Sequence, residues 1–371
     1  MAANVRALRG MAAPAALCAV VKADGYGHGA EAVARAALGA GASWLAVAMA
    51  GEATPLRAAG IDAPVLVLAE PSPGEFDDVV ALDLRPTVYT PEGIEGLARA
   101  VARAGAPPLA VHLKVDTGMH RVGAAPADAL ALASQVAERP ELVLEGLWTH
   151  CAVADVPAHP FTALQAERFR LVVEELAAAG MRPPLLHAAN SAATLDRPEL
   201  RHDLVRCGIT IYGLDPSPAL HGRLPLRPAL RLAARISLVR IVVAGEGISY
   251  GLVHRCARDS VIATVPLGYA DGVARRFSEV GGEVLVGGER RPVAGTVTMD
   301  QLLVDCGPLD DSGAGAVRPG DEVVLIGEQG DECIGAGEWA ERLGTIPYEV
   351  VCAISPRVPR HYADAQPAPG P

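Results

Sequence analysis

The sequence predicts an α/β fold: a (β/α)8 TIM-like barrel over residues 1–226, followed by a mainly β domain over residues 227–363. Three observations favour it. Short apolar runs typical of strands recur through the first part of the chain, alanine-rich stretches with amphipathic helical spacing separate them, and the pattern changes near residue 227. Strands that alternate with helices in this number favour a closed parallel barrel, and the alternative is an open doubly wound sheet.

The barrel elements can be assigned in order. The expected helices with the clearest apolar spacing are Ala30–Leu38, Pro91–Ala104, Ala127–Ala137 and Thr162–Ala179. The expected strands are Leu17–Val21, Trp44–Met49, Pro64–Ala69, Arg85–Tyr89, Leu109–Val115, Leu144–Cys151, Leu185–Ala189 and Leu204–Tyr212.

The second domain has the pattern of a β structure. Its apolar runs are separated by Gly, Pro and Asp, and a helical pattern becomes clear only at Glu338–Leu343. The segment 364–371 is rich in Ala and Pro and is predicted to be a disordered tail. The expected strands are Ile236–Val243, Ser260–Val265, Val284–Gly287, Gln301–Asp305 and Glu322–Ile326.

Composition limits the class of function. A chain of 371 residues, 50% of them hydrophobic, is too long for one ordinary core, so two domains are expected. The net charge of −11 argues against nucleic acid or an anionic membrane as the partner, and favours small-molecule chemistry. The seven cysteines never have C-x-x-C spacing, which predicts reduced cytoplasmic thiols and neither a metal site nor a disulfide framework.

The segment Val20–Gly29 predicts a cofactor-binding turn. An apolar run ends at Lys22 and is followed by three glycines with Tyr26 among them, which indicates a strand, a turn and a helix that begins near His28. Burial lowers the pKa of a lysine at a strand end and exposes the neutral amine that attacks carbonyls. Backbone amides and a phenol beside it suit an anionic, aldehyde-bearing cofactor. The alternative is a strand-end lysine that extends into solvent.

Polar residues follow other predicted strands as well, and the carboxyl ends of barrel strands carry the chemistry of such folds. Alone, His150 or His187 is often a hydrogen-bonded core histidine. Arg206 alone could pair with Asp203, and Ser191 alone could cap a helix. Their convergence on one rim favours an active site. The set comprises Lys22, Lys114, Asp116, His150, His187, Asn190, Ser191, Arg206 and Gly208.

Taken together, these segments give a chain that resembles alanine racemases, pyridoxal-phosphate enzymes of fold type III. The resemblance runs from Asn4 to Arg360 and depends on a series of motifs in the family's order, which is a highly specific signal. The motifs are Val21–Gly29, Lys114–Arg121, His187–Ser191, Arg206–Gly213, Gly247–Gly251, Gly268–Gly272 and Thr298–Gln301.

The resemblance implies pyridoxal 5'-phosphate as the cofactor, held covalently by Lys22. It also implies that Arg206 faces the pyridine nitrogen. Because a guanidinium does not give up its proton, the ring nitrogen would stay unprotonated, which favours reprotonation at the substrate α-carbon over transamination. The implied cofactor-binding residues are Lys22, Tyr26, His187, Asn190, Ser191, Arg206, Gly208 and Ile209.

The implied reaction is the interconversion of L- and D-alanine by two bases, with Lys22 on one face of the α-carbon and Tyr250 on the other. A phenol has an ordinary pKa of about 10, so Tyr250 needs neighbours that stabilise its phenolate. The resemblance assigns that part to Arg121 and His150. Arg121 is also implied to bind the substrate.

The resemblance further implies a homodimer with shared active sites, in which Tyr250 lies over the partner's Lys22. Tyr269 and Met299 are implied to bind the small amino-acid substrate from the partner side, with Asp300 in support. A monomer would then lack a complete site.

Lys114 has two interpretations. It could form an ion pair with Asp116, because positions two apart on a strand share a face. The family often carries a carbamate on this lysine, an anion able to orient Arg121. The chain departs from the family at His120, where many members have glycine, and at Pro356, where some have a phosphate-binding tyrosine.

Three other functions remain as alternatives. One is a racemase of another small amino acid such as serine, and another is a non-catalytic barrel protein that binds pyridoxal phosphate. The third is a decarboxylase of the same fold type. The second domain with Tyr250 argues against the last two. Members of the family usually begin with a further strand before the segment at Asn4, whereas this sequence starts almost at Asn4, so either that strand is missing or the start is misassigned.

Overall fold

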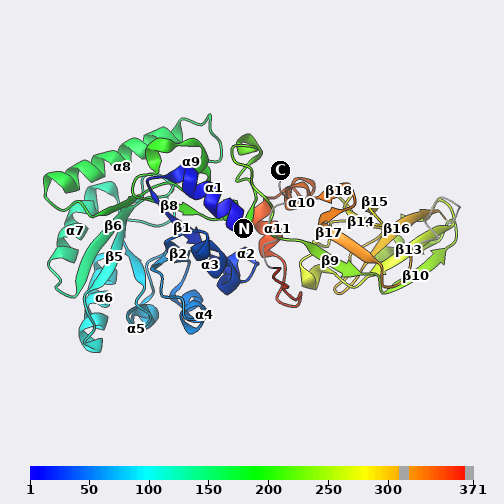
Figure 1. The fold of residues 1–371 in the computed structure, drawn as a ribbon, viewed down its shortest axis with the longest axis horizontal. Helices are drawn as coiled ribbons and strands as arrows, with labels where there is room; N and C mark the ends of the chain where they lie inside the picture. Colours follow the sequence, from blue (N-terminus) through cyan, green and yellow to red (C-terminus); the bar gives the residue numbers. More distant parts are fainter. Residues whose placement is uncertain (309–316, 364–371) are drawn as a thin grey trace. The chain divides into compact units, whose positions relative to one another are not determined.

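The structure is a computed structural model that describes residues 1–308 and 317–363, and the predicted tail 364–371 lies outside these residues. The chain divides into two units, Met1–Arg227 and Pro228–Ala363 (Figure 1). Within the described ranges, no helix combines the length and the apolar character that crossing a membrane requires.

Parallel strands covered by helices build the first unit, which confirms the predicted fold class (Figure 1). The strands are β1 (Ala16–Val20), β2 (Trp44–Val47), β3 (Val65–Val67), β4 (Arg85–Val88), β5 (Leu109–Lys114), β6 (Leu142–Trp148), β7 (Leu185–His187) and β8 (Leu204–Cys207). The helices are α1 (Ala2–Ala12), α2 (Lys22–Tyr26), α3 (Ala30–Gly39), α4 (Thr54–Ala58), α5 (Phe76–Ala81), α6 (Pro91–Ala104), α7 (Ala129–Ala137), α8 (Phe161–Ala178) and α9 (Ser191–Asp196).

The sheet is a nearly closed barrel. Its order is β7-β6-β5-β4-β3-β2-β1-β8, so β1 lies between β2 and β8. At the seam beside β7, the Asp203 amide donates to the Leu186 carbonyl and the Arg206 amide donates to the Ala189 carbonyl, each at 3.0 Å. The open doubly wound alternative is therefore wrong.

Helix α6 illustrates how the sequence sets these elements. The Thr90 hydroxyl accepts the Gly93 amide at 3.0 Å and caps the helix, which ends at Gly105 with a left-handed φ of 61°. Its buried residues include Ile94, Leu97 and Val101, which recur at helical spacing. The helix occupies the residues that the sequence predicted.

The largest difference from a predicted boundary is at β8. This strand ends at Cys207 rather than Tyr212, because Gly208 leaves the extended region with φ −102° and ψ −99° and a 3-10 turn follows. Helix α3 begins at Ala30, as the apolar spacing predicted and slightly after the start near His28 that the glycine pattern indicated, because Gly29 has a φ of 91°. Helix α1 was not predicted at all.

Helix α1 is tied to the end of the barrel unit by Asn4, which is fully buried. Its Nδ2 donates to the Ile211 carbonyl at 3.1 Å and the Arg227 carbonyl at 2.8 Å, and its Oδ1 accepts the Arg227 amide at 2.9 Å. One side chain thus bonds to three backbone groups, and one of them belongs to the fully buried Ile211.

The second unit is mainly antiparallel β structure, as predicted. β10, β13 and β16 form one sheet, β11 and β12 form a ribbon, and β14, β15, β17, β18 and β9 form another sheet. The strands are β9 (Leu232–Arg235), β10 (Leu238–Val242), β11 (Gly247–Ile248), β12 (His254–Arg255), β13 (Ser260–Val265), β14 (Glu283–Val286), β15 (Glu289–Pro292), β16 (Leu302–Pro308), β17 (Glu322–Gln329) and β18 (Glu332–Ile334), with helices α10 (Ala336–Leu343) and α11 (Pro347–Cys352).

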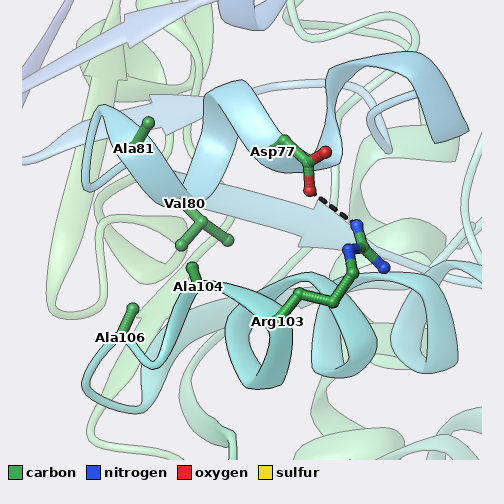
Figure 2. Close-up of a pocket in the computed structure, with 6 residues that line it drawn as sticks. All are labelled: Asp77, Val80, Ala81, Arg103, Ala104 and Ala106. Atoms are coloured by element: carbon green, nitrogen blue, oxygen red, sulfur yellow. Dashed lines mark hydrogen bonds and ion pairs between the residues drawn. The ribbon is translucent and has the colours of Figure 1, made fainter.

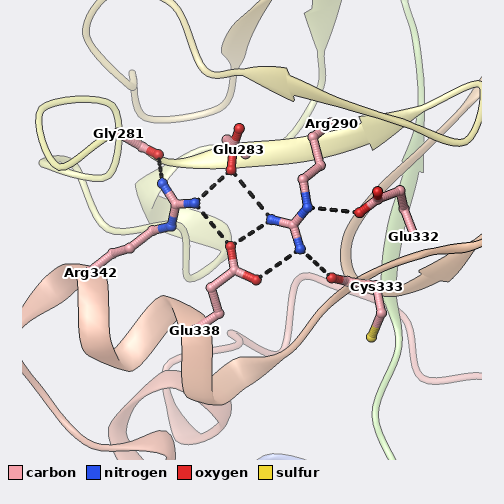
Figure 3. A network of polar contacts seen from close by, with 7 residues as sticks. All are labelled: Gly281, Glu283, Arg290, Glu332, Cys333, Glu338 and Arg342. Carbon is pink, nitrogen blue, oxygen red and sulfur yellow. Dashed lines mark hydrogen bonds and ion pairs between the residues drawn. The ribbon is translucent and has the colours of Figure 1, made fainter.

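An ion-pair network fastens α10 to the larger sheet of this unit (Figure 3). Arg290 donates to Glu338 and to Glu332, each at 2.8 Å. Arg342 donates to Glu283 at 2.6 Å and to Glu338 at 3.0 Å. Since these two cations and three carboxylates satisfy one another, we interpret the cluster as a structural cross-link.

The contacts of Asn4 give a stability prediction. Asn4→Leu fills the space with an apolar side chain but removes three hydrogen bonds and leaves the buried Ile211 carbonyl without this partner, and should lower the free energy of unfolding by about 2–3 kcal/mol. Urea unfolding followed by tryptophan fluorescence measures the change. Ala3→Leu, at an exposed position of the same helix, is the control and should change stability by less than about 0.5 kcal/mol. An Asn4→Leu protein as stable as the control would contradict this role.

Candidate active site

Lys22 begins a left-handed turn at the carboxyl end of β1. Residues 23–26 all have φ between 50° and 62°, which is strained for residues with a Cβ. Two carboxylates hold this main chain: Glu52 accepts the Ala23 amide at 2.7 Å, and Asp24 accepts the first amide of α3 at 2.8 Å. The turn therefore presents Lys22 from a fixed backbone.

Hydroxyls and amides converge beside this turn. The ring centres of Tyr26 and Tyr212 lie 4.8 Å apart, and a Cβ added at Gly208 would lie 2.4 Å from the Tyr26 hydroxyl. Only glycine therefore allows the phenol to reach the backbone here. The Gly208 amide donates to the Ser191 hydroxyl at 2.9 Å, and the Thr210 hydroxyl lies 3.1 Å from the same oxygen. This polar cradle, formed by Tyr26, Ser191 and Gly208, has the donors that a phosphate requires.

Two other predicted cofactor residues, Asn190 and Ile209, lie next to this cradle in the chain. The Asn190 side chain caps α9 by accepting the Ala193 amide at 3.0 Å. Ile209 is fully buried, so its side chain belongs to the core and only its main chain can serve the cradle.

Arg206 on β8 carries a buried charge, since only 3% of the residue is exposed. Its Nη1 donates to the carbonyl and Nδ1 of His187 at 2.9 and 3.0 Å. Its Nη2 donates to the carbonyls of Thr149 and Ala188 at 2.8 and 3.2 Å and contacts Nδ1 of His150 at 3.3 Å. All of these acceptors are neutral. Burial lowers the pKa of Arg206 to about 10, which leaves it protonated at neutral pH.

The contacts of Arg206 fix the protons of two histidines. Because a guanidinium only donates, His187 accepts at Nδ1 and carries its proton on Nε2. That proton points to Nδ1 of His112, 2.9 Å away, so His112 carries its own proton on Nε2 and donates it to Glu145 at 3.0 Å. Burial lowers the pKa of both imidazoles, that of His187 well below its ordinary range. A relay of neutral histidines thus connects Arg206 to a carboxylate.

Lys114 and Arg206 both lie over the indole ring of Trp148. Lys114 is 4% exposed, and its Nζ lies 4.1 Å from the ring centre while Cζ of Arg206 lies 4.5 Å from it. Burial and the charges of Arg206 and Arg121 lower the pKa of Lys114 to about 7. Asp116 does not neutralise this lysine by an ion pair; its Oδ1 instead accepts three successive amides of the following turn at 2.9 to 3.1 Å.

The pKa of His150 reflects how close the predicted residues lie to one another. Burial lowers its pKa well below the ordinary value, and the charges of Arg206, Lys114, Arg121 and Lys22 lower it further. These side chains come from the carboxyl ends of β1, β5, β6 and β8 or from the loops that follow. The structure therefore brings the predicted residues of the barrel unit together on one rim.

Sequence reasoning missed three side chains that contact the site or continue its relay into the barrel: His112, Glu145 and Trp148. His112 lies two positions before Lys114 and so on the same face of β5, a signal that the period of two could have provided. Gly146 makes room for it, since a Cβ at Gly146 would lie 2.2 Å from His112 Nδ1.

A separate hollow lies between α5 and α6 (Figure 2). An ion pair of 2.6 Å between Asp77 and Arg103 crosses it, and the other lining residues are Val80, Ala81, Ala104 and Ala106. It contains none of the predicted site residues, so the barrel rim remains the candidate site.

In the second unit, Tyr250 lies on a turn whose backbone is held by hydrogen bonds, and the Tyr250 side chain is exposed. Ser249 has a φ of 61° and its hydroxyl donates to the Thr296 carbonyl at 2.6 Å. The Thr296 hydroxyl donates in return to the Tyr250 carbonyl at 2.9 Å. Tyr250 itself is 73% exposed, an unusual placement for a tyrosine on a well-anchored turn.

Tyr269 and Met299 are also exposed and lie on neighbouring backbone. The Tyr269 amide donates to the Thr298 carbonyl at 3.0 Å, and a Cβ added at Gly268 would lie 2.2 Å from that carbonyl oxygen. Asp300 accepts a hydrogen bond from Arg357 at 2.8 Å. The second unit thus groups three predicted residues on one short stretch of surface.

Comparisons with known proteins cover both units. The family described as "Alanine racemase, N-terminal domain" matches residues 1–216, and "Alanine racemase, C-terminal domain" matches residues 229–362. An alanine racemase of Symbiobacterium thermophilum is 49% identical over 97% of this chain and 94% of its own. Among solved structures, alanine racemase from Streptomyces lavendulae has a TM-score of 0.91 at 40% identity, covering 98% of this chain and 95% of that one.

One structural relative carries a different substrate in its name. Histidine racemase from Leuconostoc mesenteroides has a TM-score of 0.86 at 28% identity, over 96% of this chain and 93% of its own. The shared fold alone therefore does not determine which amino acid is racemised.

The relay predicts specific tautomers. In protein labelled with 15N-histidine, both His187 and His112 should be neutral at pH 7 with the proton on Nε2, because Arg206 can only donate to the first and the first then donates to the second. Long-range 15N–1H correlation spectra distinguish the tautomers, and His112→Phe and His187→Phe assign the signals. A proton on Nδ1 of either ring, or a charged ring at pH 7, would contradict the relay.

Proposed function

The chain belongs to the alanine racemase family, a family of isomerases, and we propose that it interconverts L- and D-alanine with pyridoxal 5'-phosphate and two bases, Lys22 and Tyr250. The observation that supports it most is the cradle of Tyr26, Ser191 and Gly208 beside the Lys22 turn. The Tyr26 hydroxyl can lie this close to the main chain of residue 208 only because that residue is glycine.

The residues present fit the cofactor. The phosphate would be held by the hydroxyls of Tyr26 and Ser191 and the amides of Gly208 and Ile209, and Lys22 would hold the aldehyde carbon. When bound, pyridoxal phosphate withdraws electrons from the substrate α-carbon and so makes its hydrogen acidic. The protein then has to move that proton from one face to the other.

Arg206 would donate to the pyridine nitrogen. Its pKa of about 10 keeps the guanidinium charged through the neutral range, so it cannot hand a proton over. With Arg206 in this role the pyridine nitrogen would stay unprotonated, which would limit electron withdrawal and favour return of the proton to the substrate α-carbon.

Tyr250 would act on the face opposite Lys22. Its phenolate needs stabilisation, and Arg121 would supply the charge. His150 contributes differently from what its residue type suggests: because its pKa is well below the ordinary value and Nδ1 faces Arg206, it is a neutral imidazole that offers Nε2–H as a donor.

We further propose that a homodimer completes the site. Tyr250 is 73% exposed on its own chain, and Tyr269 and Met299 are exposed beside it, which suits side chains that meet a second subunit. Asp300, held by Arg357, would support the substrate end of this surface. Each site would then combine the barrel rim of one chain with this surface of its partner.

Lys114 would carry a carbamate. Its pKa of about 7 leaves a large neutral fraction, and the cations around it favour an anion at this position. The amine nitrogen bonds to the carbon of carbon dioxide and releases one proton to solvent, which turns the side chain into an anion. That anion would orient Arg121 by a charge-assisted hydrogen bond.

Chiral analysis tests the function directly. Purified protein loaded with pyridoxal phosphate should convert either enantiomer of alanine into the other. Tyr250→Phe should slow this by about a hundredfold or more, since a positioned acid–base group contributes that much. In D2O the variant should still exchange the α-hydrogen of one enantiomer without inversion, because Lys22 remains.

Three results would contradict this function: optically unchanged alanine, racemisation by Tyr250→Phe at the unsubstituted rate, or loss of exchange for both enantiomers. The alternative is a racemase of another small amino acid such as serine, and the histidine racemase that shares the fold illustrates that the substrate can differ within it. It predicts that a panel of L-amino acids yields a faster substrate than alanine.

The carbamate has its own test. Protein equilibrated with 13C-bicarbonate above pH 7 should show a carbamate carbon signal that is absent in Lys114→Arg, whose guanidinium does not form one. The signal should weaken as the pH falls below 7, because protonation of the amine removes the nucleophile. A spectrum identical to that of the variant would refute the modification.

A further inference from the structure

Gln165, near the start of α8, joins two loops of the candidate site. The residue is 1% exposed. Its Nε2 donates to the Thr117 hydroxyl at 3.2 Å and the His150 carbonyl at 3.0 Å, and its Oε1 accepts the Ala152 amide at 2.8 Å. A single buried amide thus bonds to the loop after β5 and to the segment after β6.

Each of these two segments contains or leads to a different residue of the candidate site. Thr117 begins the turn that leads to Arg121, and His150 follows β6. The Thr117 hydroxyl also lies 2.8 Å from the Thr149 hydroxyl, so the two segments meet directly as well as through Gln165. The distance between Arg121 and His150 therefore depends on this junction.

A second residue of α8 strengthens the contact with the same turn. Arg168, one helical turn after Gln165, donates from Nη1 to the Thr117 carbonyl at 2.9 Å. A Cβ added at Gly118 would lie 2.7 Å from Phe161 Cζ and 2.9 Å from Arg168 Nη1. The turn is thus seated against the helix with no space for displacement.

Asp116 and Gln165 contribute separately to the placement of Arg121. Asp116 fixes the shape of the turn, since its carboxylate accepts the amides of Gly118, Met119 and His120. It does not determine where the turn lies relative to β6. Gln165 and Arg168, whose backbone belongs to a helix of 18 residues, contribute to that placement together with the contact between Thr117 and Thr149.

We propose that Gln165 is a positioning residue, which sets Arg121 relative to His150 for the reaction. The inference rests on the proposed function, in which these two side chains support Tyr250. Gln165 itself touches neither substrate nor cofactor. Its loss should therefore impair the turnover of alanine and leave cofactor binding intact, because the phosphate cradle lies on other segments, beside β1, β7 and β8.

The test is Gln165→Met, a substitution of similar volume that removes all three hydrogen bonds. The kcat/KM for alanine should fall by about tenfold or more, as expected when a catalytic group is slightly displaced. Cofactor affinity, read from absorbance, should stay within about twofold of the unsubstituted protein. Amides 118–121 should exchange hydrogen faster, measured by mass spectrometry without substrate. The matched control is Gln135→Met on α7, which should change none of these.

Two substitutions at Thr117 test the same proposal if the Gln165→Met protein does not fold. Thr117→Val removes the hydroxyl and should reproduce the loss, and Thr117→Ser retains it and should restore kcat/KM to within about threefold of the unsubstituted protein. Unchanged kcat/KM and unchanged exchange at 118–121 would overturn the inference. If the unsubstituted protein does not racemise alanine, the proposed function fails, and the exchange of 118–121 still decides whether Gln165 holds the turn.

Discussion

The buried guanidinium of Arg206 sets the electrostatics of the whole rim. A buried charge is costly unless polar groups surround it, and here they are three carbonyls and two imidazoles from the ends of β6 and β7 and the loops that follow. Burial and this charge together lower the pKa values of Lys114, His150 and His187, so the two imidazoles are neutral at pH 7 and a large fraction of the lysine is neutral as well. The permanent charge of Arg206 thus favours the neutral forms of the Lys114 amine and of the two imidazoles, which are the forms that can accept protons.

No carboxylate pairs directly with Arg206 among the described residues: Glu145, at the far end of the relay, lies 3.4 Å from Arg85 and reaches Arg206 only through two imidazoles of fixed tautomer. This arrangement explains why Arg206 does not need Asp203, whose carboxylate instead accepts the Leu186 amide at 2.9 Å. It also has a consequence for stability. The buried histidines take up a proton less readily than they would in the unfolded chain, whose ordinary value is 6.5, so folding should weaken as the pH falls below that value.

Much of this could be predicted from the sequence, and the rest could not for identifiable reasons. Alternating apolar runs and amphipathic spacing predicted the barrel, and Lys22 with its glycines predicted the turn that follows β1. The end of β8 at Cys207 could not be predicted, because it depends on the dihedral angles of Gly208. The contacts of Asn4 with Arg227 and of Gln165 with Thr117 join residues far apart in the chain, and no local pattern contains them.

Whether the two bases of one site come from different chains is the central question, and complementation answers it most directly. Lys22→Ala and Tyr250→Phe each remove one base and should be nearly inactive alone. When both chains are co-expressed, half of the dimers are mixed and each mixed dimer has one intact site, so about a quarter of the unsubstituted activity should return. Activity that stays at the level of the separate variants would contradict a site shared between subunits.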